Sequence, residues 1–341
     1  MIKTIKKAHN YNMIDLCRFL GAYIVIACHA NPTVDCPDSI WAEFIEIGTE
    51  LIVSFYFVTT GFFLFIKMKD EKSEKIKKID SYTNRIVKMY CIATLVSLPL
   101  TIYGYVVSGN SIISCILSYI KYFFFVGKLF NSYHLWYLLA LIYALIVIRV
   151  MVSKNIKEEY IFIVALLVYT FFEVMWYAIA DIDQLSGISY KLVSLFEYVF
   201  NKGNVFSGFI YVAIGILIAK YKKYLNIWAC IIGIVVIYMF SPCLSDATND
   251  YLRLVAVTLL YMGMLGISLP NHKCYARMRK MSMMVYLSHL IFLSIYTFLI
   301  INEPNKYGID TFLVTSIAST IFAWIYCAKI KAVKQRKTGD S

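Results

Sequence analysis

Arg18 and His29 stand eleven residues apart in an apolar segment near the beginning of the chain, DLCRFLGAYIVIACH. At about 100° per residue this spacing makes three turns of an α-helix, so both side chains share one face, about 16 Å apart along the axis. Imidazole can take a proton from a hydroxyl near neutral pH, and a guanidinium binds phosphate or carboxylate. Asp15 shares the face and can offset the charge of Arg18. The pattern indicates transfer of a group from a phosphate-bearing donor to an alcohol.

Other ionisable side chains also lie in apolar segments. Because burying a charge in a membrane is costly, each of these residues is a candidate for a functional role. Glu173 lies among aromatic residues and could be a proton relay, a substrate contact or a protonated packing residue. His289 could bind substrate or make a hydrogen bond between helices. By chemistry alone, His134 and Trp136 are typical of an anchor at the membrane interface. Arg18 and His29 also have a non-catalytic interpretation, in which His29 lies at the outer membrane interface and Arg18 extends toward water.

The composition requires a lipid environment for these segments. Sixty per cent of the 341 residues are hydrophobic and 16% are charged, against about half apolar and a quarter charged in soluble domains. Apolar runs of roughly 17–25 residues are the unit that crosses a bilayer. We therefore predict an all-α polytopic membrane protein with about ten transmembrane helices, at 14–30, 48–66, 86–107, 134–152, 160–180, 204–220, 225–241, 251–269, 281–301 and 311–328.

The lysines and arginines fix the predicted orientation, because they collect in cytoplasmic loops. With both termini in the cytoplasm and 111–127 not crossing, six basic residues face outward: Lys121, Lys128, Lys191, Lys202, Arg253 and Lys306. If 111–127 crossed, the strongly basic loops after it would face outward instead. We therefore predict that 111–127 is interfacial or re-entrant.

The formal net charge of +12 follows from this topology and from attraction to anionic lipid headgroups. No nucleic-acid partner is expected, because the basic residues are dispersed over several loops. The dense loop 67–88 is either a solvated loop or a site for an anionic cytoplasmic ligand. No metal-ligand spacing is present, and a disulfide between Cys36 and Cys243 is allowed because both fall in predicted outside loops.

Five motifs in order resemble those of the acyltransferase-3 family of ten-helix membrane acyltransferases. The first is the Arg18–His29 pair, and the second is SFYFVTTGFFLF, in which Thr60 replaces the family's serine before Gly61. The others are a basic entry to the third helix at 85–88, the HLWYL opening at 134–138, and Tyr-Leu-x-His at 286–289. The resemblance covers residues 12–328.

The resemblance implies an O-acyltransferase that moves an acyl group, usually acetyl, from cytoplasmic acyl-CoA to a hydroxyl of a glycan or lipid-linked glycan of the cell envelope. It implies that His29 and Arg18 are catalytic and that Arg85 and Lys88 face the CoA phosphates. Lys88 replaces a second arginine, which keeps the charge but loses bidentate geometry. Asp15, His134, Trp136, Glu173 and His289 are the predicted substrate-contacting residues. No permanently bound cofactor is expected.

The same resemblance predicts the organisation of the chain. It comprises a cytoplasmic tail at 1–13, a transmembrane acyltransferase-like domain at 14–328 and a basic cytoplasmic tail at 329–341. The expected location is a bacterial inner or plasma membrane. Many relatives carry a fused extracellular domain, so an extracytoplasmic partner of this chain would be a separate protein.

Two further readings stay open. The HLWY motif and NKGNVFSGFIYVAIGILIAK also resemble the membrane module of VanT-type serine racemases, which favours a carrier for an amino acid without acyl chemistry. In that reading Glu173, Arg18 and His289 line a pathway. A purely structural membrane subunit is the third reading.

Overall fold

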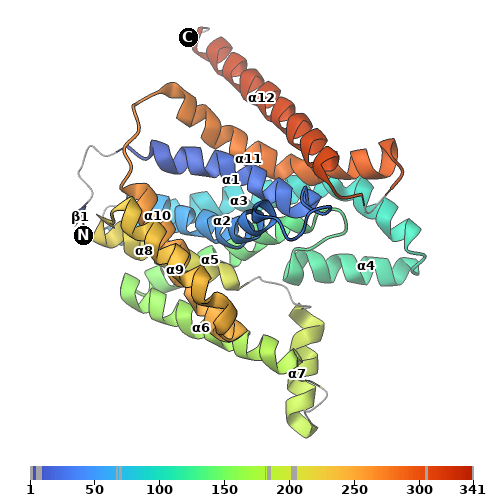
Figure 1. The fold of residues 1–341 in the computed structure, drawn as a ribbon, viewed down its shortest axis with the longest axis horizontal. Coiled ribbons are helices and arrows are strands. Elements are labelled where there is room, and N and C mark those ends of the chain that lie inside the picture. Colours follow the sequence, from blue (N-terminus) through green and yellow to red (C-terminus); the bar gives the residue numbers. More distant parts are fainter. Residues whose placement is uncertain are drawn as a thin grey trace.

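The structure of the protein is a computed structural model that describes residues 3–4, 10–66, 68, 71–180, 182, 186–200, 206–303 and 306–339. Parts of the predicted tails at 1–13 and 329–341, and the lysines at 67 and 202, lie outside the described residues. The described chain is almost entirely helical, as the apolar periodicity predicts (Figure 1).

Ten helices coincide with the ten predicted spans. They are α1 (Asn12–Ala30), α2 (Ile40–Phe65), α3 (Lys72–Val107), α5 (Trp136–Ser153), α6 (Glu158–Ala180), α8 (Ser207–Tyr221), α9 (Ile227–Phe240), α10 (Asp246–Leu265), α11 (Lys273–Ser294) and α12 (Ile309–Gly339). Short elements complete the description: β1 (Lys3–Thr4), α4 (Ile112–Lys121), η1 (Tyr122–Val126), η2 (Tyr133–Leu135), α7 (Gly187–Phe200), β2 (Lys223–Tyr224), η4 (Ser241–Cys243) and η5 (Ile295–Ile300).

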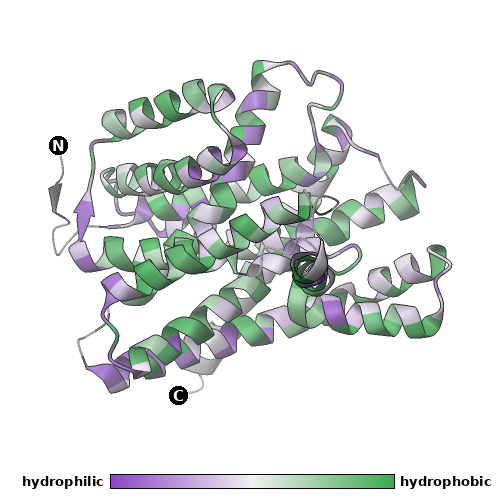
Figure 2. Cartoon of the chain, turned by 90° about the horizontal axis from the view of Figure 1, so that it is seen from below, coloured by the Kyte–Doolittle hydropathy of each residue, from purple (hydrophilic) through white to green (hydrophobic). Residues whose placement is uncertain are grey.

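Seven of the described helical segments are long and apolar enough to cross a membrane, namely α1, α2, α3, α6, η2 with α5, α11 with η5, and α12. The α8 and α9 helices are shorter than predicted, at 15 and 14 residues. Figure 2 shows hydrophobic colour along most of the helices and hydrophilic colour mainly at their ends and in the connections. The protein is therefore an all-α, multi-pass membrane protein.

The helix directions agree with alternating spans. Helices α1 and α11 run parallel, because Asp15 pairs with Arg279 at one end while His29 meets His289 further along. Helices α3 and α5 run antiparallel, because Asp80 pairs with Arg149 near the beginning of α3 and the end of α5. The first and ninth spans are thus parallel, and the third and fourth are antiparallel, as the predicted topology requires.

One group of ion pairs lies at helix ends that the charge pattern assigns to the cytoplasm. Lys75 at the start of α3 and Lys220 at the end of α8 each lie 3.1 Å from a carboxylate oxygen of Glu158, at the start of α6. Lys220 also lies 2.7 Å from Glu159. Three helix ends that the topology places on one side are therefore joined by salt bridges.

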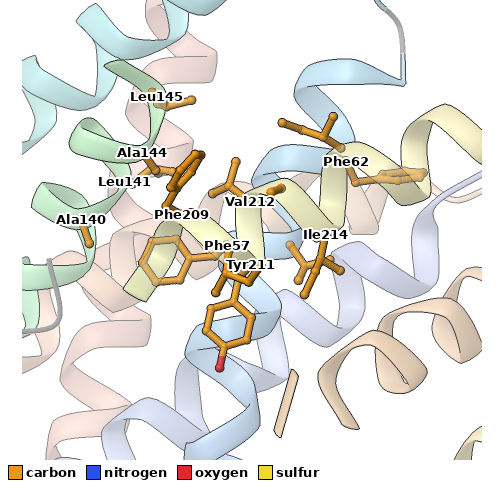
Figure 3. Packing of buried hydrophobic residues seen from close by; sticks show 14 of the residues in the cluster. Phe57, Phe62, Ala140, Leu141, Ala144, Leu145, Phe209, Tyr211, Val212 and Ile214 are labelled. Carbon is orange, nitrogen blue, oxygen red and sulfur yellow. The ribbon is translucent and has the colours of Figure 1, made fainter. Parts of the chain in front are cut away.

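The core is centred on α2 and α8, which approach each other through small residues. Figure 3 shows Phe57 and Phe62 of α2 among Phe209, Val212 and Ile214 of α8. Glycines permit backbones to come this close in a membrane bundle. A Cβ atom built on Gly61 would lie 2.0 Å from the carbonyl oxygen of Val212.

The predicted interfacial segment 111–127 forms α4 and η1. Their 10 and 5 residues give a length of about 22 Å, which is too short for a hydrocarbon core of about 30 Å. No residue of α4 is buried, and Ile112 is 78% exposed. Figure 1 shows α4 at the margin of the bundle.

The helix α7 lies between α6 and α8, outside the ten predicted spans, and the sequence analysis predicted no element for it. Val193 and Phe196 of α7 are buried against α6, whereas Ile188 and Leu192 are exposed. The segment was missed because 14 helical residues with apolar positions on one face are too short to resemble a span. A second feature that was not predicted is the antiparallel pairing of β1 with β2, which joins residues 3–4 to the α8–α9 connection.

Cysteine labelling tests the orientation. Cys36 and Cys243 are free and exposed, so the structure contains no disulfide between them. In single-cysteine variants of intact cells, we expect a membrane-impermeant maleimide to label both positions, since both precede a predicted inward-running helix. Cys274, at the start of α11, should be labelled only after the membrane is opened. Labelling of Cys274 in intact cells would reverse the assigned orientation.

Candidate functional site

Three histidines converge from separate parts of the chain. His29 lies in the last turn of α1, His134 on η2, and His289 in the middle of α11. The ring centroids of His29 and His289 are 5.3 Å apart with planes at 14°, and those of His134 and His289 are 4.9 Å apart at 66°. Sequence analysis singled out all three residues but did not place them together.

The backbone around this histidine cluster (His29, His134 and His289) is held by hydrogen bonds between elements. The hydroxyl of Tyr286 on α11 donates to the carbonyl oxygen of His134, which fixes η2 against α11. The amide of Gly308 donates to the carbonyl oxygen of Ala30 at 2.9 Å, which ties the chain before α12 to the end of α1. The site is therefore built where α1, η2 and α11 meet.

Gly127 permits the chain to enter η2. Its φ of +74° lies in the left-handed region, which glycine adopts without steric cost. A Cβ atom there would also lie 2.5 Å from the Cα atom of Trp136. The loop after η1 thus passes directly over the first residue of α5. This close approach places Tyr133 and His134 at the end of α1, where the rings of Tyr133 and His29 lie 4.9 Å apart, edge to face.

The next question for the histidine cluster is which of its buried ring nitrogens have hydrogen-bond partners. His289 is 0% exposed and His134 is 2% exposed. Nδ1 of His289 lies 2.6 Å from the carbonyl oxygen of Tyr286. Nε2 of His289 is buried without a hydrogen-bond partner among the described residues, whereas the ring of His134 interacts with the backbone of Leu287. Buried polar atoms are normally satisfied by protein groups or ordered water, so Nε2 of His289 is an acceptor that remains open to such a partner.

His134 is therefore not the interfacial anchor that its chemistry suggested, because its ring is enclosed by His289 and Tyr286. The half-buried Trp136 lies two residues further along, with its ring 6.2 Å from that of Phe57 on α2. It packs between α5 and α2 and makes no ring contact with the cluster among the described residues.

Arg18 lies at the other end of the shared face of α1, as predicted. Its Nη1 is 4.0 Å from Oδ1 of the buried Asp15, and its Nε is buried without a partner in the described structure. Sequence analysis missed Arg279 of α11, whose Nη1 lies closer to Asp15, at 3.3 Å from Oδ2. One carboxylate therefore holds two guanidinium groups at the end assigned to the cytoplasm.

A line of tyrosines leads from Arg18 toward the histidine cluster. The Tyr56 hydroxyl donates to the Arg18 carbonyl oxygen at 2.5 Å, and the Ser282 hydroxyl donates to the same atom at 2.7 Å. Ring centroids then follow at 6.3 Å from Tyr56 to Tyr137, and at 5.7 Å from Tyr137 to Tyr286. The Tyr286 ring lies 5.3 Å from that of His134 and 5.9 Å from that of His289.

Arg85 and Lys88 are exposed on the part of α3 that is assigned to the cytoplasm. The Arg85 guanidinium lies over the ring of Tyr82, 4.7 Å from its centroid. Neither side chain contacts the histidine cluster or Arg18 among the described residues. An anionic ligand held there would have to reach from the surface toward Arg18.

Glu173 belongs to a second polar group on α6, α2 and α10, away from the histidines. It interacts electrostatically with Asp250 and Arg253. The Arg253 guanidinium donates to Asp250 at 2.7 Å and to Glu50 at 2.8 Å. The Tyr177 hydroxyl donates to Asp250 at 2.7 Å. The five predicted substrate residues therefore do not form one site. His134 and His289 belong to the histidine cluster, Asp15 pairs with Arg18 and Arg279, Trp136 packs against Phe57, and Glu173 lies in the group around Arg253.

Tyr56 and Tyr137 were missed because tyrosine is abundant in this chain, with 28 residues, and most of them are belt or packing residues. No group of histidine, cysteine and carboxylate side chains that could hold a metal ion occurs among the residues that the structure describes. Imidazole rings such as those of the cluster can take up and release protons and make hydrogen bonds.

Comparison with known proteins agrees with the resemblance. A family model described as an acyltransferase domain matches residues 11–328. Two proteins of Enterococcus faecalis called amino-acid racemase are 27% identical over 65% of this chain and 24% identical over 96% of it. A serine/alanine racemase of Enterococcus gallinarum is 21% identical over 81% of the chain.

The chain spans half the length of these relatives or less, since the matches cover 31%, 48% and 40% of the three proteins. No solved structure is significantly similar to the chain. The comparisons therefore concern the membrane domain that the chain contains.

Proposed function

Because the chain belongs to the acyltransferase-3 family, whose acyltransferase domain spans residues 11–328, we propose that it is a membrane-bound O-acyltransferase. The donor is cytoplasmic acyl-CoA, most simply acetyl-CoA, and the acceptor is a hydroxyl of a cell-envelope glycan or lipid-linked glycan. The membrane is the plasma membrane of a bacterium. The observation that carries the proposal is the single face of α1 with Arg18 at one end and His29 at the other, joined by tyrosines.

The reaction assigns a task to each end of this face. His29 takes the proton of the acceptor hydroxyl as the oxygen attacks the thioester carbonyl, so a C–O bond forms. The C–S bond then breaks, and the CoA thiolate leaves and takes the proton from His29. The products are the O-acyl ester and CoA, and no metal or redox partner is consumed.

Arg18 is suited to the donor side. A guanidinium binds phosphate and stabilises developing negative charge, and the Arg18 Nε is buried without a partner among the described residues. The Arg18 and His29 side chains lie about 16 Å apart along the helix axis. A donor with a long flexible arm can therefore be held by its charged end while its thioester approaches His29.

Purified protein in nanodiscs with labelled acetyl-CoA tests the proposal. We expect acceptor-dependent release of CoA and label in an ester that mild base removes. Transport of label without release of CoA, or no binding of CoA, would contradict the acyltransferase assignment.

Arg85 and Lys88 are proposed to bind the phosphates of CoA at the surface. Replacing either residue with alanine is expected to raise KM for acetyl-CoA about 10-fold with little change in kcat, since each charge-assisted contact contributes about 1.5–3 kcal/mol. Lys154, at the same side of the membrane, provides the matched control. An equal loss of kcat in all three variants would contradict a role in donor binding.

A second candidate is a carrier for an amino acid or a similar zwitterion. The specific observation is the group around Arg253, where one guanidinium lies between the carboxylates of Glu50 and Asp250 beside Glu173. Such a group can pair with a carboxylate and an ammonium together. The relatives are named as racemases of amino acids. Uptake of labelled serine or alanine into liposomes in the absence of acetyl-CoA would favour this function.

A further inference from the structure

His289 has one ring nitrogen whose role is fixed by the backbone. A carbonyl oxygen only accepts hydrogen bonds, so the 2.6 Å contact between Nδ1 and the Tyr286 carbonyl requires a proton on Nδ1. In the neutral ring Nε2 then carries a lone pair and can only accept. This nitrogen is fully buried and has no hydrogen-bond partner among the described residues.

Two imidazole rings lie beside that of His289, the ring of His134 at a centroid distance of 4.9 Å and the ring of His29 at 5.3 Å. Of these two, only His29 has been assigned the task of taking the acceptor's proton. The planes of the His29 and His289 rings lie at 14° to each other. The two rings stack in this structure, and a rotation of His29 that turns its edge toward His289 would bring its N–H to Nε2. We propose that His289 is the positioning residue of His29, and that its Nε2 accepts a hydrogen bond from the His29 N–H that faces away from the acceptor.

The bond would serve the reaction in two ways. It fixes the tautomer of His29, so that the nitrogen facing the acceptor hydroxyl is unprotonated when catalysis begins. It also stabilises the imidazolium that forms when His29 takes the proton. A base that is itself oriented by a third group is the general arrangement for activating a weak nucleophile.

A neutral orienting group suits this location. In the part of the chain that the structure describes, no carboxylate pairs with any of the three histidines. A buried carboxylate beside His29 would have to be desolvated within the membrane, at a cost that its attraction to the imidazolium does not reliably repay. A second imidazole supplies the acceptor without a permanent charge.

Tyr286 serves both histidines on this side of the site. Its carbonyl oxygen holds Nδ1 of His289, and its hydroxyl holds the backbone of His134. The ring of the buried His134 lies 4.9 Å from that of His289. The orientation of His289 is thus set by α11 itself and by η2.

Two substitutions separate the nitrogens of His289. His289→Asn keeps an amide N–H near the position of Nδ1 but has no atom at Nε2. His289→Gln places an amide oxygen near the position of Nε2. Because this inference rests on the proposed function, turnover of acetyl-CoA by the full-length chain is measured together with a readout that needs no donor.

For turnover, we expect His289→Asn to lower kcat about 100-fold with KM for acetyl-CoA within about threefold of wild type. The kcat of His289→Gln should be at least about 10-fold higher than that of His289→Asn. Thermal unfolding midpoints should match between the variants. An Asn variant with wild-type kcat, or a Gln variant as inactive as Asn at equal stability, would overturn the proposal.

The second readout is the rate at which diethyl pyrocarbonate modifies His29, followed by mass spectrometry. Loss of the hydrogen-bond acceptor makes His29 a weaker nucleophile, so its modification should slow several-fold in His289→Asn and stay near the wild-type rate in His289→Gln. An unchanged or faster rate in the Asn variant would overturn the proposal. Failure of wild type to use acetyl-CoA would overturn the proposed function alone, because this rate is measured without donor.

Discussion

Replacing His29 with alanine is expected to lower kcat for acyl transfer by at least about 100-fold, because a positioned general base contributes about 10²–10⁴-fold. The binding of acetyl-CoA should change little, since the donor is assigned to Arg85 and Lys88 of α3 and to Arg18 at the opposite end of α1. The measurement is release of CoA and formation of labelled ester by purified protein, together with the Kd for acetyl-CoA.

The adjacent Cys28 provides a matched control. It is exposed, whereas His29 faces His289 and Tyr133. Cys28→Ala changes the same helical turn without touching the cluster, and it should retain wild-type kcat. If His29→Ala keeps more than about a tenth of the activity at equal protein level, His29 is not the base. If both variants fold poorly, the third reading of a structural subunit gains support.

The distance between the two ends of α1 also predicts how the effects separate. Removal of Arg18 should affect donor binding and kcat together, since Arg18 is assigned to the donor and its charge is held by Asp15. Removal of His29 should affect kcat alone. The two sets of kinetic constants therefore distinguish an acyltransferase from a carrier, in which both residues would line one pathway and act on the same flux.

The class of the fold could be predicted because composition and hydrophobic periodicity, both visible in the sequence, determine it. Long apolar runs and the distribution of lysine and arginine depend only on the membrane, so the ten predicted spans coincide with helices. The amphipathic α7 was missed because its apolar positions cover only one face. The short α8 was predicted a few residues too long because apolar residues before Ser207 continue its pattern.

The site was predicted only in part because its members meet through tertiary packing. The Arg18–His29 spacing is a property of one helix and is readable along the chain. The contact between His134 and His289 depends on the turn at Gly127 and on the Tyr286 hydrogen bond. Arg279 could have been suspected, because it is basic and lies within the first two turns of a helix parallel to α1, but only the packing of α1 on α11 brings it to Asp15.

Replacing Gly61 with alanine is expected to lower the stability of the bundle by about 1–3 kcal/mol, which is typical of overpacking a well-packed core. A Cβ atom at this position would lie 2.0 Å from the carbonyl oxygen of Val212, and the reciprocal Gly215 Cβ would lie 2.1 Å from that of Val58. Both neighbours are backbone atoms, so a side-chain rotation cannot relieve the clash. Helices α2 and α8 would have to move apart.

Gly48→Ala is the matched control on the same helix. Its Cβ atom would lie 3.2 Å from the Cγ2 atom and 3.6 Å from the Cδ1 atom of Ile24, both in a side chain and not in a backbone, and alanine is a better helix former than glycine by about 1 kcal/mol. This variant should therefore be as stable as wild type or slightly more stable. The measurement is the thermal unfolding midpoint in detergent and the monodisperse fraction by size-exclusion chromatography.

The Gly61 substitution should also reach the functional site, because α2 carries Tyr56. The Tyr56 hydroxyl holds the carbonyl oxygen of Arg18, and its ring begins the line of tyrosines toward the histidine cluster. A shift of α2 away from α8 would displace Tyr56 relative to α1, so kcat should fall in the Gly61→Ala variant even at temperatures where it is fully folded. Equal midpoints and equal kcat for Gly61→Ala and Gly48→Ala would show that the α2–α8 contact can open at no cost, and the close packing at this interface would then not be what positions Arg18.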